Sequence, residues 1–225
     1  MTLTTNKANI KEIFTSIQGE GPYIGYRQLF IRFCGCNLTC KYCDTDFNIN
    51  NSLVFSSEEL AKEVQKHGDC HSVSLTGGEP LLNTEFLKNF LPECTLPVYL
   101  ETNATLPNEL KQIINYADFV AADIKLPSCT GLNPFWDKHD DFFKVASQKE
   151  LFVKIVFDEN ITDEEIELSA KLCKKYDTEL ILQPKNTDVF IKPDIILVNH
   201  VLDKFLEIHK KVRIIPQVHK IMQIQ

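Results

Sequence analysis

Long apolar runs, positive charge and glycine are all scarce in this sequence of 225 residues. No apolar stretch approaches the roughly 20 residues that a membrane-spanning helix needs, and residues 1–8 lack the apolar core of a secretory signal. The chain has 24 Lys and Arg against 31 Asp and Glu, and this net charge of −7 argues against binding of nucleic acid through phosphate contacts. We therefore expect a cytoplasmic chain with no membrane and no nucleic-acid partner.

Glycine and proline are also too rare for a collagen-like or low-complexity chain, at 8 and 10 residues. Hydrophobic residues make up 44% of the sequence, which is enough to build a packed core. No linker or internal repeat divides the chain. A single domain over residues 1–225 is the expectation for this length.

The eight cysteines are unevenly placed. Cys36, Cys40 and Cys43 form a C-x3-C-x2-C cluster, and Cys34 lies two residues before it. Disulfides are rare in the cytosol, where clustered cysteines more often hold a metal or carry out redox chemistry. The other four are scattered among apolar neighbours, and we expect them to be buried small residues: Cys70, Cys94, Cys129 and Cys173.

Short β-type runs alternate with helix-type segments along the chain. Strands are expected at 28–33, 72–75, 98–100, 119–122, 151–157, 180–182 and 212–215. Helices are expected at 56–68, 83–90, 107–116, 162–176 and 194–210, two of them opened by capping-box patterns, at Ser56–Glu59 and Thr162–Glu165. Residues 126–140 contain Pro127, Gly131 and Pro134 and are expected to form a loop or small insertion. The alternation predicts a parallel sheet with helices outside it, and about six such units make a partial barrel.

Polar groups follow five of the expected strands. They are Cys36, Thr76–Glu79, Glu101–Asn103, Asp123–Lys125 and Gln183. Any one of them could be a turn former, but five in succession favour a site, because α/β barrels build their sites at the carboxyl ends of the strands.

Two kinds of metal centre are compatible with the cysteine spacing. Zinc takes four tetrahedral ligands, often from two C-x2-C pairs, and here a fourth ligand would have to be Cys34 or a distant histidine. A [4Fe–4S] cluster usually takes four cysteines, and with three of them one iron stays open for another molecule. On spacing alone, a zinc-stabilised binding module without catalysis and an iron–sulfur protein both remain open.

Two motifs together resemble the radical S-adenosylmethionine (SAM) superfamily. The first is the cysteine cluster with Tyr42 before its last cysteine, and the second is TGGEP at residues 76–80, which is similar to the superfamily's Gly-Gly-Glu-Pro motif. The resemblance implies a partial (β/α)6-type TIM barrel with shortened helices. It implies a [4Fe–4S] cluster on Cys36, Cys40 and Cys43, with SAM bound at the open iron. A flavodoxin- or ferredoxin-type reductant would supply the electron that cleaves SAM into a 5′-deoxyadenosyl radical.

Three further segments together resemble the 7-carboxy-7-deazaguanine synthase family. They are EIFTSIQGEGP at residues 12–22, RFCGCNL at residues 32–38 and CDT at residues 43–45, and QVHK at residues 217–220 looks similar too. The resemblance implies ring contraction of 6-carboxy-5,6,7,8-tetrahydropterin to 7-carboxy-7-deazaguanine with loss of ammonia, in queuosine and 7-deazapurine biosynthesis. The alternative within the superfamily is an activase that generates a glycyl radical on a partner protein.

The resemblance also implies roles for single residues. Thr45 would bind Mg²⁺ through its hydroxyl group, and Arg32 would pair with the substrate carboxylate. The pterin would contact Ile17, Gln18, Gly19, Arg32, Thr76 and Gln225. SAM would contact Tyr42, Cys43, Asp44, Gly78, Asp123, Ile124, Lys125 and Gln183. No side chain is expected to be catalytic, because the cofactor carries the radical. The family resemblance further implies a homodimer. His219 is a candidate for lining the substrate pocket, and Cys34 is expected to be a strand residue.

Overall fold

The structure is a computed structural model that describes residues 6–43, 45, 46, 48–185 and 194–224. Within them, nine strands form one sheet in the order β3-β1-β2-β4-β5-β6-β7-β8-β9. Their bounds are β1 (Lys7–Ile17), β2 (Arg27–Phe33), β3 (Leu53–Ser56), β4 (Ser72–Gly77), β5 (Val98–Thr102), β6 (Phe119–Asp123), β7 (Glu150–Phe157), β8 (Glu179–Pro184) and β9 (Val212–Ile214). From β2 to β9 all neighbours are parallel, whereas β1 pairs antiparallel with both β2 and β3.

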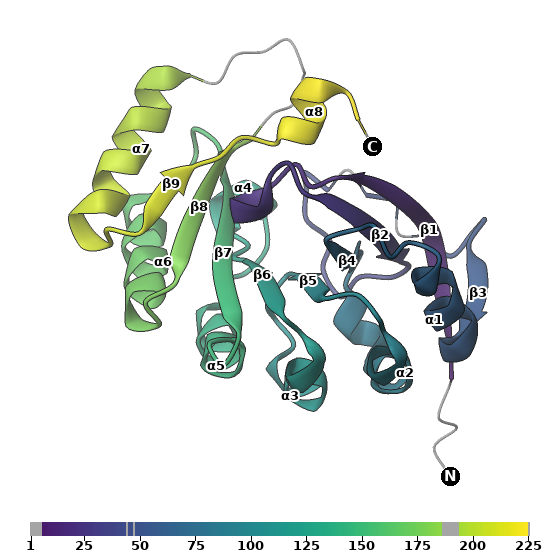
Figure 1. The fold of residues 1–225 in the computed structure, drawn as a ribbon. Helices are drawn as coiled ribbons and strands as arrows, with labels where there is room; N and C mark the ends of the chain where they lie inside the picture. The colour runs from purple at the N-terminus through teal and green to yellow at the C-terminus, as the bar shows by residue number, and fades with distance from the viewer. Residues whose placement is uncertain (1–5, 44, 47, 186–193, 225) are drawn as a thin grey trace.

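Six helices connect successive parallel strands in the described part of the chain. They are α1 (Ser57–Gln65), α2 (Thr84–Phe90), α3 (Pro107–Ile113), α5 (Trp136–Ala146), α6 (Asp163–Lys175) and α7 (Ile195–Ile208). Shorter elements are η1 (Gly21–Tyr23), η2 (Pro80–Asn83), η3 (Leu91–Glu93), η4 (Ile114–Tyr116), α4 (Pro127–Thr130) and α8 (Val218–Met222). Figure 1 shows the sheet curved like an open fan with α2, α3, α5 and α6 on its outer side. The predicted partial barrel is confirmed.

The two predicted capping boxes are present. At the start of α1, the backbone N–H of Glu59 donates to Ser56 Oγ at 3.3 Å and Ser56 N–H donates back to Glu59 Oε2 at 2.8 Å. The same exchange opens α6 between Thr162 and Glu165, at 3.2 and 2.9 Å. Each box satisfies two backbone donors that a helix start leaves free.

The structure corrects the sequence prediction at residues 126–140, at β1, at β3 and at Cys34, which follows β2 and is not part of the strand. Residues 126–140 are not all loop, because α5 begins at Trp136, and its buried face is formed by His139, Phe142, Phe143 and Ala146. Phe135 at its N-cap makes no side-chain capping bond, so the usual start signal is missing. Strands β1 and β3 were not predicted either. Most β1 residues are only half-buried, so the alternation that announces a strand is weak, and pairing with β2 decides the conformation.

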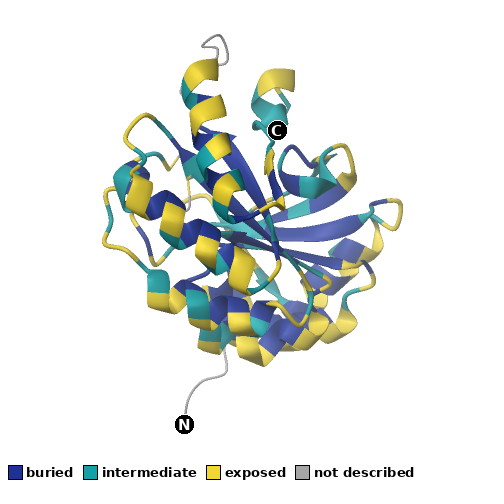
Figure 2. Cartoon of the chain, turned by 90° about the vertical axis from the view of Figure 1, so that its left-hand side faces the viewer, coloured by how far each residue is buried: buried dark blue, intermediate teal, exposed yellow. Residues whose placement is uncertain are grey.

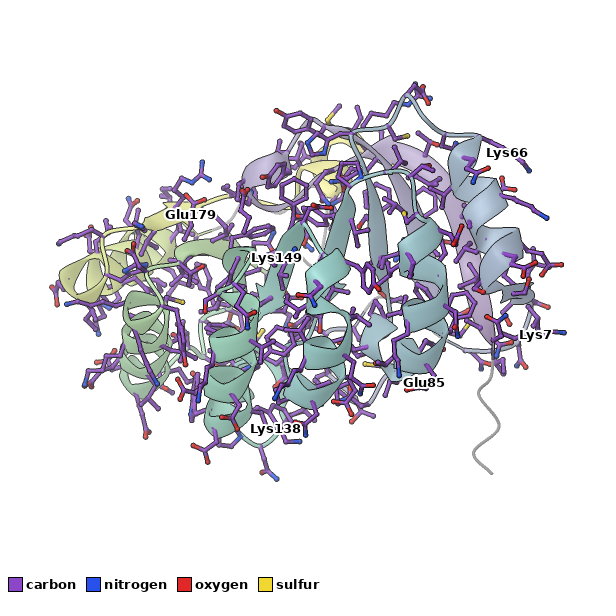
Figure 3. The ribbon with its side chains drawn as sticks, turned by 60° about the horizontal axis from the view of Figure 1, so that its bottom comes forward. Lys7, Lys66, Glu85, Lys138, Lys149 and Glu179 are labelled. Atoms are coloured by element: carbon purple, nitrogen blue, oxygen red, sulfur yellow. The ribbon has the colours of Figure 1, made fainter. Side chains whose placement is uncertain are left out.

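The main core lies between the outer face of the sheet and the helices (Figure 2). Figure 3 shows charged side chains such as Glu85 and Lys138 on the outer helical layer. Of the four scattered cysteines, Cys70, Cys129 and Cys173 are buried, as predicted, and Cys94 is half-buried. No helix in the described part of the chain is both long and apolar enough to cross a membrane.

The inner face of the sheet carries an apolar layer with a polar layer next to it. The apolar layer consists of Tyr99, Ala121, Phe152 and Ile181, with Tyr23 of η1 packed against it. Because side chains alternate between the faces of a strand, the residue two positions on points the same way. In β5, β6, β7 and β8 that next inward residue is polar: Glu101, Asp123, Lys154 and Gln183. The polar layer lies toward the carboxyl ends of these strands.

Candidate active site

Two adjoining pockets lie at the carboxyl edge of the sheet. The first is lined by all four residues of the polar layer and by Cys36, Cys40 and Cys43. The second lies beside β1 and β2 and is lined by Phe14, Ile17, Gln18, Gly19, Phe30, Arg32 and His219, among others. Five residues line both pockets: Glu20, Thr45, Thr76, Glu101 and Gln217. The carboxyl edge therefore carries one continuous site with two compartments.

The cysteine loop follows β2 and places its three thiols in the first pocket. Cys36 Sγ accepts the backbone N–H of Leu38 at 3.4 Å, and Asn103 Nδ2 lies 3.9 Å from the same sulfur. Burial raises the pKa of Cys36 and Cys40. Both thiols are therefore harder to ionise than usual unless a bound metal stabilises the thiolate. Among the described residues, no three His, Cys, Asp or Glu side chains are placed to hold a single metal ion.

Gly77 lies against the end of β2 and Gly78 against the start of the cysteine loop, and neither position has room for a Cβ. Gly77 has φ +118°, and a Cβ on it would lie 2.3 Å from the carbonyl oxygen of Phe33. A Cβ on Gly78 would lie 1.9 Å from the carbonyl oxygen of Gly35. In this structure glycine is therefore required at 78 by the neighbouring loop backbone, while Gly78 itself still lines the first pocket.

Glu79 is fully buried and joins this motif to the end of β5. Its carboxylate accepts from Thr102 Oγ1 at 2.9 and 3.0 Å, from Asn103 N–H at 2.8 Å and from Leu81 N–H at 3.1 Å. Burial nevertheless outweighs these hydrogen bonds and raises the pKa of Glu79 to about 7. The role of Glu79 is to hold two strand ends together.

Tyr42, Asp123 and Lys125 form a contact group on the wall of the first pocket. Lys125 Nζ lies 3.0 Å from Asp123 Oδ2 and 3.4 Å from the Tyr42 hydroxyl group. Burial alone would lower the pKa of Lys125, but Asp123 holds it well above its usual value. Burial also raises the pKa of Tyr42 to about 12, so its hydroxyl group stays protonated.

The remaining residues predicted to contact SAM divide into three kinds. Gln183 lines the first pocket and is 1% exposed, and its Nε2 has no hydrogen-bond partner among the described residues. Ile124 belongs to the main core and lines neither pocket, so a ligand contact by its side chain is not supported. Asp44 lies outside the described residues, as does Gln225, which was predicted to contact the pterin.

The residues predicted to contact the pterin gather in the second pocket. Gln18 already uses its amide within the protein, because Nε2 donates to Gln28 and Glu101 at 2.9 and 3.0 Å while Oε1 accepts Glu20 N–H at 3.0 Å. Arg32 Nε donates to Glu12 Oε2 at 3.0 Å, and its guanidinium lies 5.5 Å from the ring centre of Phe14. Thr45 and Thr76 sit at the boundary between the compartments.

Sequence reasoning missed Lys154, a buried cation in the first pocket. Its Nζ lies 2.6 Å from Glu20 Oε2, 3.6 Å from Asp123 Oδ1 and 3.9 Å from Glu101 Oε2. Burial disfavours the charge, but these carboxylates raise its pKa well above the usual value. The available signal was a lysine inside the apolar run of β7, two residues after Phe152 on the same face.

Comparison with known proteins places the chain in a family. The family model described as the Radical SAM superfamily matches residues 30–173. A 7-carboxy-7-deazaguanine synthase of Geobacter sulfurreducens is 39% identical, over 96% of this chain and 97% of the relative. One of Archaeoglobus fulgidus is 38% identical, over 97% of this chain and 100% of the relative. The chain belongs to the 7-carboxy-7-deazaguanine synthase family. The crystal structure of QueE from Escherichia coli has the same fold, with a TM-score of 0.65, 95% of each chain covered and 20% identity.

The 7-carboxy-7-deazaguanine synthase family lies within a superfamily defined by an iron–sulfur cluster and SAM, and the first pocket fits both groups. Three thiols from one loop face it, and Leu38 N–H is already directed at one sulfur, as second-shell donors to cluster sulfurs are. The buried Nε2 of Gln183 has no hydrogen-bond partner among the described residues, so it can donate a hydrogen bond to a bound ligand.

Proposed function

We infer that this chain is a 7-carboxy-7-deazaguanine synthase, which converts 6-carboxy-5,6,7,8-tetrahydropterin to 7-carboxy-7-deazaguanine with loss of ammonia. One observation carries the inference: the pocket lined by Ile17, Gln18, Gly19 and Arg32 adjoins the pocket that holds the three cysteines. A substrate in the second compartment would thus lie next to a radical source in the first. Similarity to synthases over nearly the whole chain supports the same conclusion.

In this proposal the first pocket holds the [4Fe–4S] cluster on Cys36, Cys40 and Cys43, with SAM beside it. Once reduced by an external electron donor, these groups would supply the radical chemistry that hydrogen abstraction from the pterin requires. The protein's part is to hold and orient: the Asp123–Lys125 ion pair lines the SAM compartment with a fixed carboxylate and ammonium. Tyr42 and Gln183 supply a hydroxyl group and an amide donor in the same compartment, and Cys43 and Gly78 complete its wall.

The second pocket holds the pterin. The Arg32 guanidinium is suited to the substrate carboxylate, because its fork of donors pairs with both oxygens. Arg32 pairs with Glu12 in the structure, and the Glu12 side chain is 43% exposed, so a bound carboxylate competes with a partner that is partly screened by solvent. Thr45 lies at the junction of the pockets, where its hydroxyl group is placed to be one ligand of a Mg²⁺ that keeps waters and takes substrate oxygens.

Further parts of the proposal concern partners and location. We propose a homodimer, a flavodoxin- or ferredoxin-type reductant, a cytoplasmic location, and one domain over residues 1–225. The single continuous sheet supports the last point. A reducing compartment suits a protein whose cysteines are to hold an iron–sulfur cluster.

A product assay tests the function. Anaerobically purified and reduced protein is incubated with carboxytetrahydropterin, SAM and Mg²⁺, and the products are separated by liquid chromatography with mass detection. The proposal expects 7-carboxy-7-deazaguanine and released ammonia. SAM cleavage without a deazapurine would instead favour the glycyl-radical activase, and tightly bound zinc in place of iron and sulfide would favour the binding module.

A further inference from the structure

Lys154 is a buried cation in the first pocket with three carboxylate neighbours. Its side chain is 4% exposed and faces carboxylates from three different elements: Glu20 before η1, Glu101 at the end of β5 and Asp123 at the end of β6. Nothing in the proposed chemistry uses an ammonium group at this place. A buried charge is retained only when its partners compensate for lost hydration, so the arrangement of the partners indicates what Lys154 does.

Glu20 also contacts the C-terminal segment. Its Oε2 accepts from Lys154 Nζ at 2.6 Å, and its Oε1 accepts from Gln217 Nε2 at 2.7 Å. Lys154 and the hydrogen bond from Gln217 hold the pKa of Glu20 at about 2 although burial would raise it, so this carboxylate is ionised at neutral pH. A charged acceptor makes a stronger hydrogen bond to the Gln217 amide than a neutral one would.

The C-terminal segment, residues 217–222, packs against the same stretch that carries Glu20. Val218 N–H donates to the carbonyl oxygen of Gly19 at 2.9 Å. The approach is close, because a Cβ on Gly19 would lie 2.6 Å from the backbone nitrogen and side chain of His219. Gln217 and His219 are both lining residues of the second pocket. Figure 1 shows α8 next to the purple turn between β1 and β2, and only residues 215–217 separate it from β9.

We propose that Lys154 is a positioning residue for the pterin compartment, acting through Glu20 to hold Gln217 and the C-terminal segment as one wall of the second pocket. Lys154 belongs to β7, inside the rigid sheet, whereas residues 217–222 have no strand partner. The Lys154–Glu20–Gln217 chain ties this short segment to the barrel wall. The inference rests on the proposed function only for the identity of the ligand in that compartment.

The test compares Lys154→Met, Gln217→Leu and the double variant in the loaded enzyme, with Lys144→Met on the exposed face of α5 as the matched control. Without substrate, amide hydrogen exchange of residues 217–224 should accelerate in both single variants. With substrate, the KM for the pterin should rise at least about tenfold, the loss expected for a hydrogen bond to a charged group. Lys144→Met should match the wild type in both measurements, and SAM affinity is measured alongside because Lys154 also lines the first pocket.

The double variant separates positioning from general destabilisation. If Lys154 acts through Glu20 and Gln217, the two substitutions break one connection, and the double variant should have about the KM of the single variants. Multiplied effects on KM, or a lowered melting temperature with unchanged KM, would show that Lys154 only stabilises the fold. Should Lys154→Met not fold, Gln217→Leu decides alone, because unchanged exchange in residues 217–224 would overturn the proposal. Hydrogen exchange needs no turnover, so failure of the synthase assay leaves this test intact.

Discussion

The buried carboxylate of Glu79 accepts the hydroxyl group of Thr102, with its two oxygens at 2.9 and 3.0 Å. The contact crosses from the glycine motif after β4 to the last residue of β5. It links the glycine motif, which packs against the cysteine loop, to Asn103. The side-chain amide of Asn103 lies 3.9 Å from Cys36 Sγ. Glu79 thus affects the site by holding the ends of β4 and β5 together. Because it is buried, its ionisation should change the stability of the fold.

Glu79 should make stability fall as the pH rises. Its pKa is raised to about 7 in the folded chain from a usual value of 4.5, so the folded state binds the extra proton between these values. Its contribution is fully present below about pH 4.5 and is lost as the pH passes through about 7, a change on the order of 3 kcal/mol. Denaturant unfolding of the wild type and Glu79→Gln from pH 5 to 8 measures it. Parallel curves for the two proteins would contradict the raised pKa.

Cys40→Ala should abolish binding of the iron–sulfur cluster, because a thiolate ligand is lost. The expected result is a protein reconstituted with much less than four irons and four sulfides per chain and with no cleavage of SAM. Cys34→Ala is the matched control. Cys34 Sγ lies 3.6 Å from the carbonyl oxygen of Asn48 and does not line either pocket, so this variant should keep its iron. Loss of iron from both would instead make Cys34 a ligand.

Gly78→Ala should weaken cluster assembly by pushing the cysteine loop away. The new Cβ would lie 1.9 Å from the carbonyl oxygen of Gly35, which is closer than any real contact, so the backbone next to Cys36 has to move. Gly68→Ala is the control, since a Cβ there has nothing within 4 Å. Iron content after reconstitution and the absorbance of the cluster report the effect. Equal iron contents in the two variants would show that the loop has room to relax.

Thr45→Ala should reduce the response of turnover to Mg²⁺ while leaving the cluster and SAM binding in place. The substitution removes one hydroxyl ligand from a cation that takes its other ligands from water and substrate. The midpoint of the Mg²⁺ titration should rise about tenfold, in line with the loss of a single charge-assisted contact. Thr45→Ser keeps the hydroxyl group and should restore the wild-type midpoint. A Thr45→Ala enzyme with an unchanged Mg²⁺ titration would remove Thr45 from the site.

Local signals predicted the parts of the molecule that depend on neighbours in sequence. The Ser56–Glu59 and Thr162–Glu165 boxes identify two helix starts because their bonds span three residues. The cysteine loop and the glycine motif were recognisable because their spacing is short. β1 escaped prediction since its conformation comes from pairing with β2, which is a tertiary effect.

Lys154 shows why part of the site stayed hidden. A lysine in a strand says nothing by itself about its partners, and Glu20, Glu101 and Asp123 come from three other elements. The register of β5, β6 and β7 brings Glu101 and Asp123 to Lys154, whereas Glu20 comes from the turn before η1. The sequence placed Glu101 among the polar groups that follow strands, but the cation that contacts it was not predicted. The period-two pattern of the inner face, read across several strands at once, is the signal that would have found it.

Five residues line both pockets, so SAM in the first pocket and the pterin in the second would contact the same side chains. A ligand bound in one pocket would restrict these side chains for the other, and the affinities for SAM and for the pterin should therefore depend on each other. Occupancy by SAM should change the Kd for the pterin, and reciprocity requires the pterin to change the Kd for SAM by the same factor. Titrations in both orders of addition would therefore yield a single coupling constant, set by Glu20, Thr45, Thr76, Glu101 and Gln217.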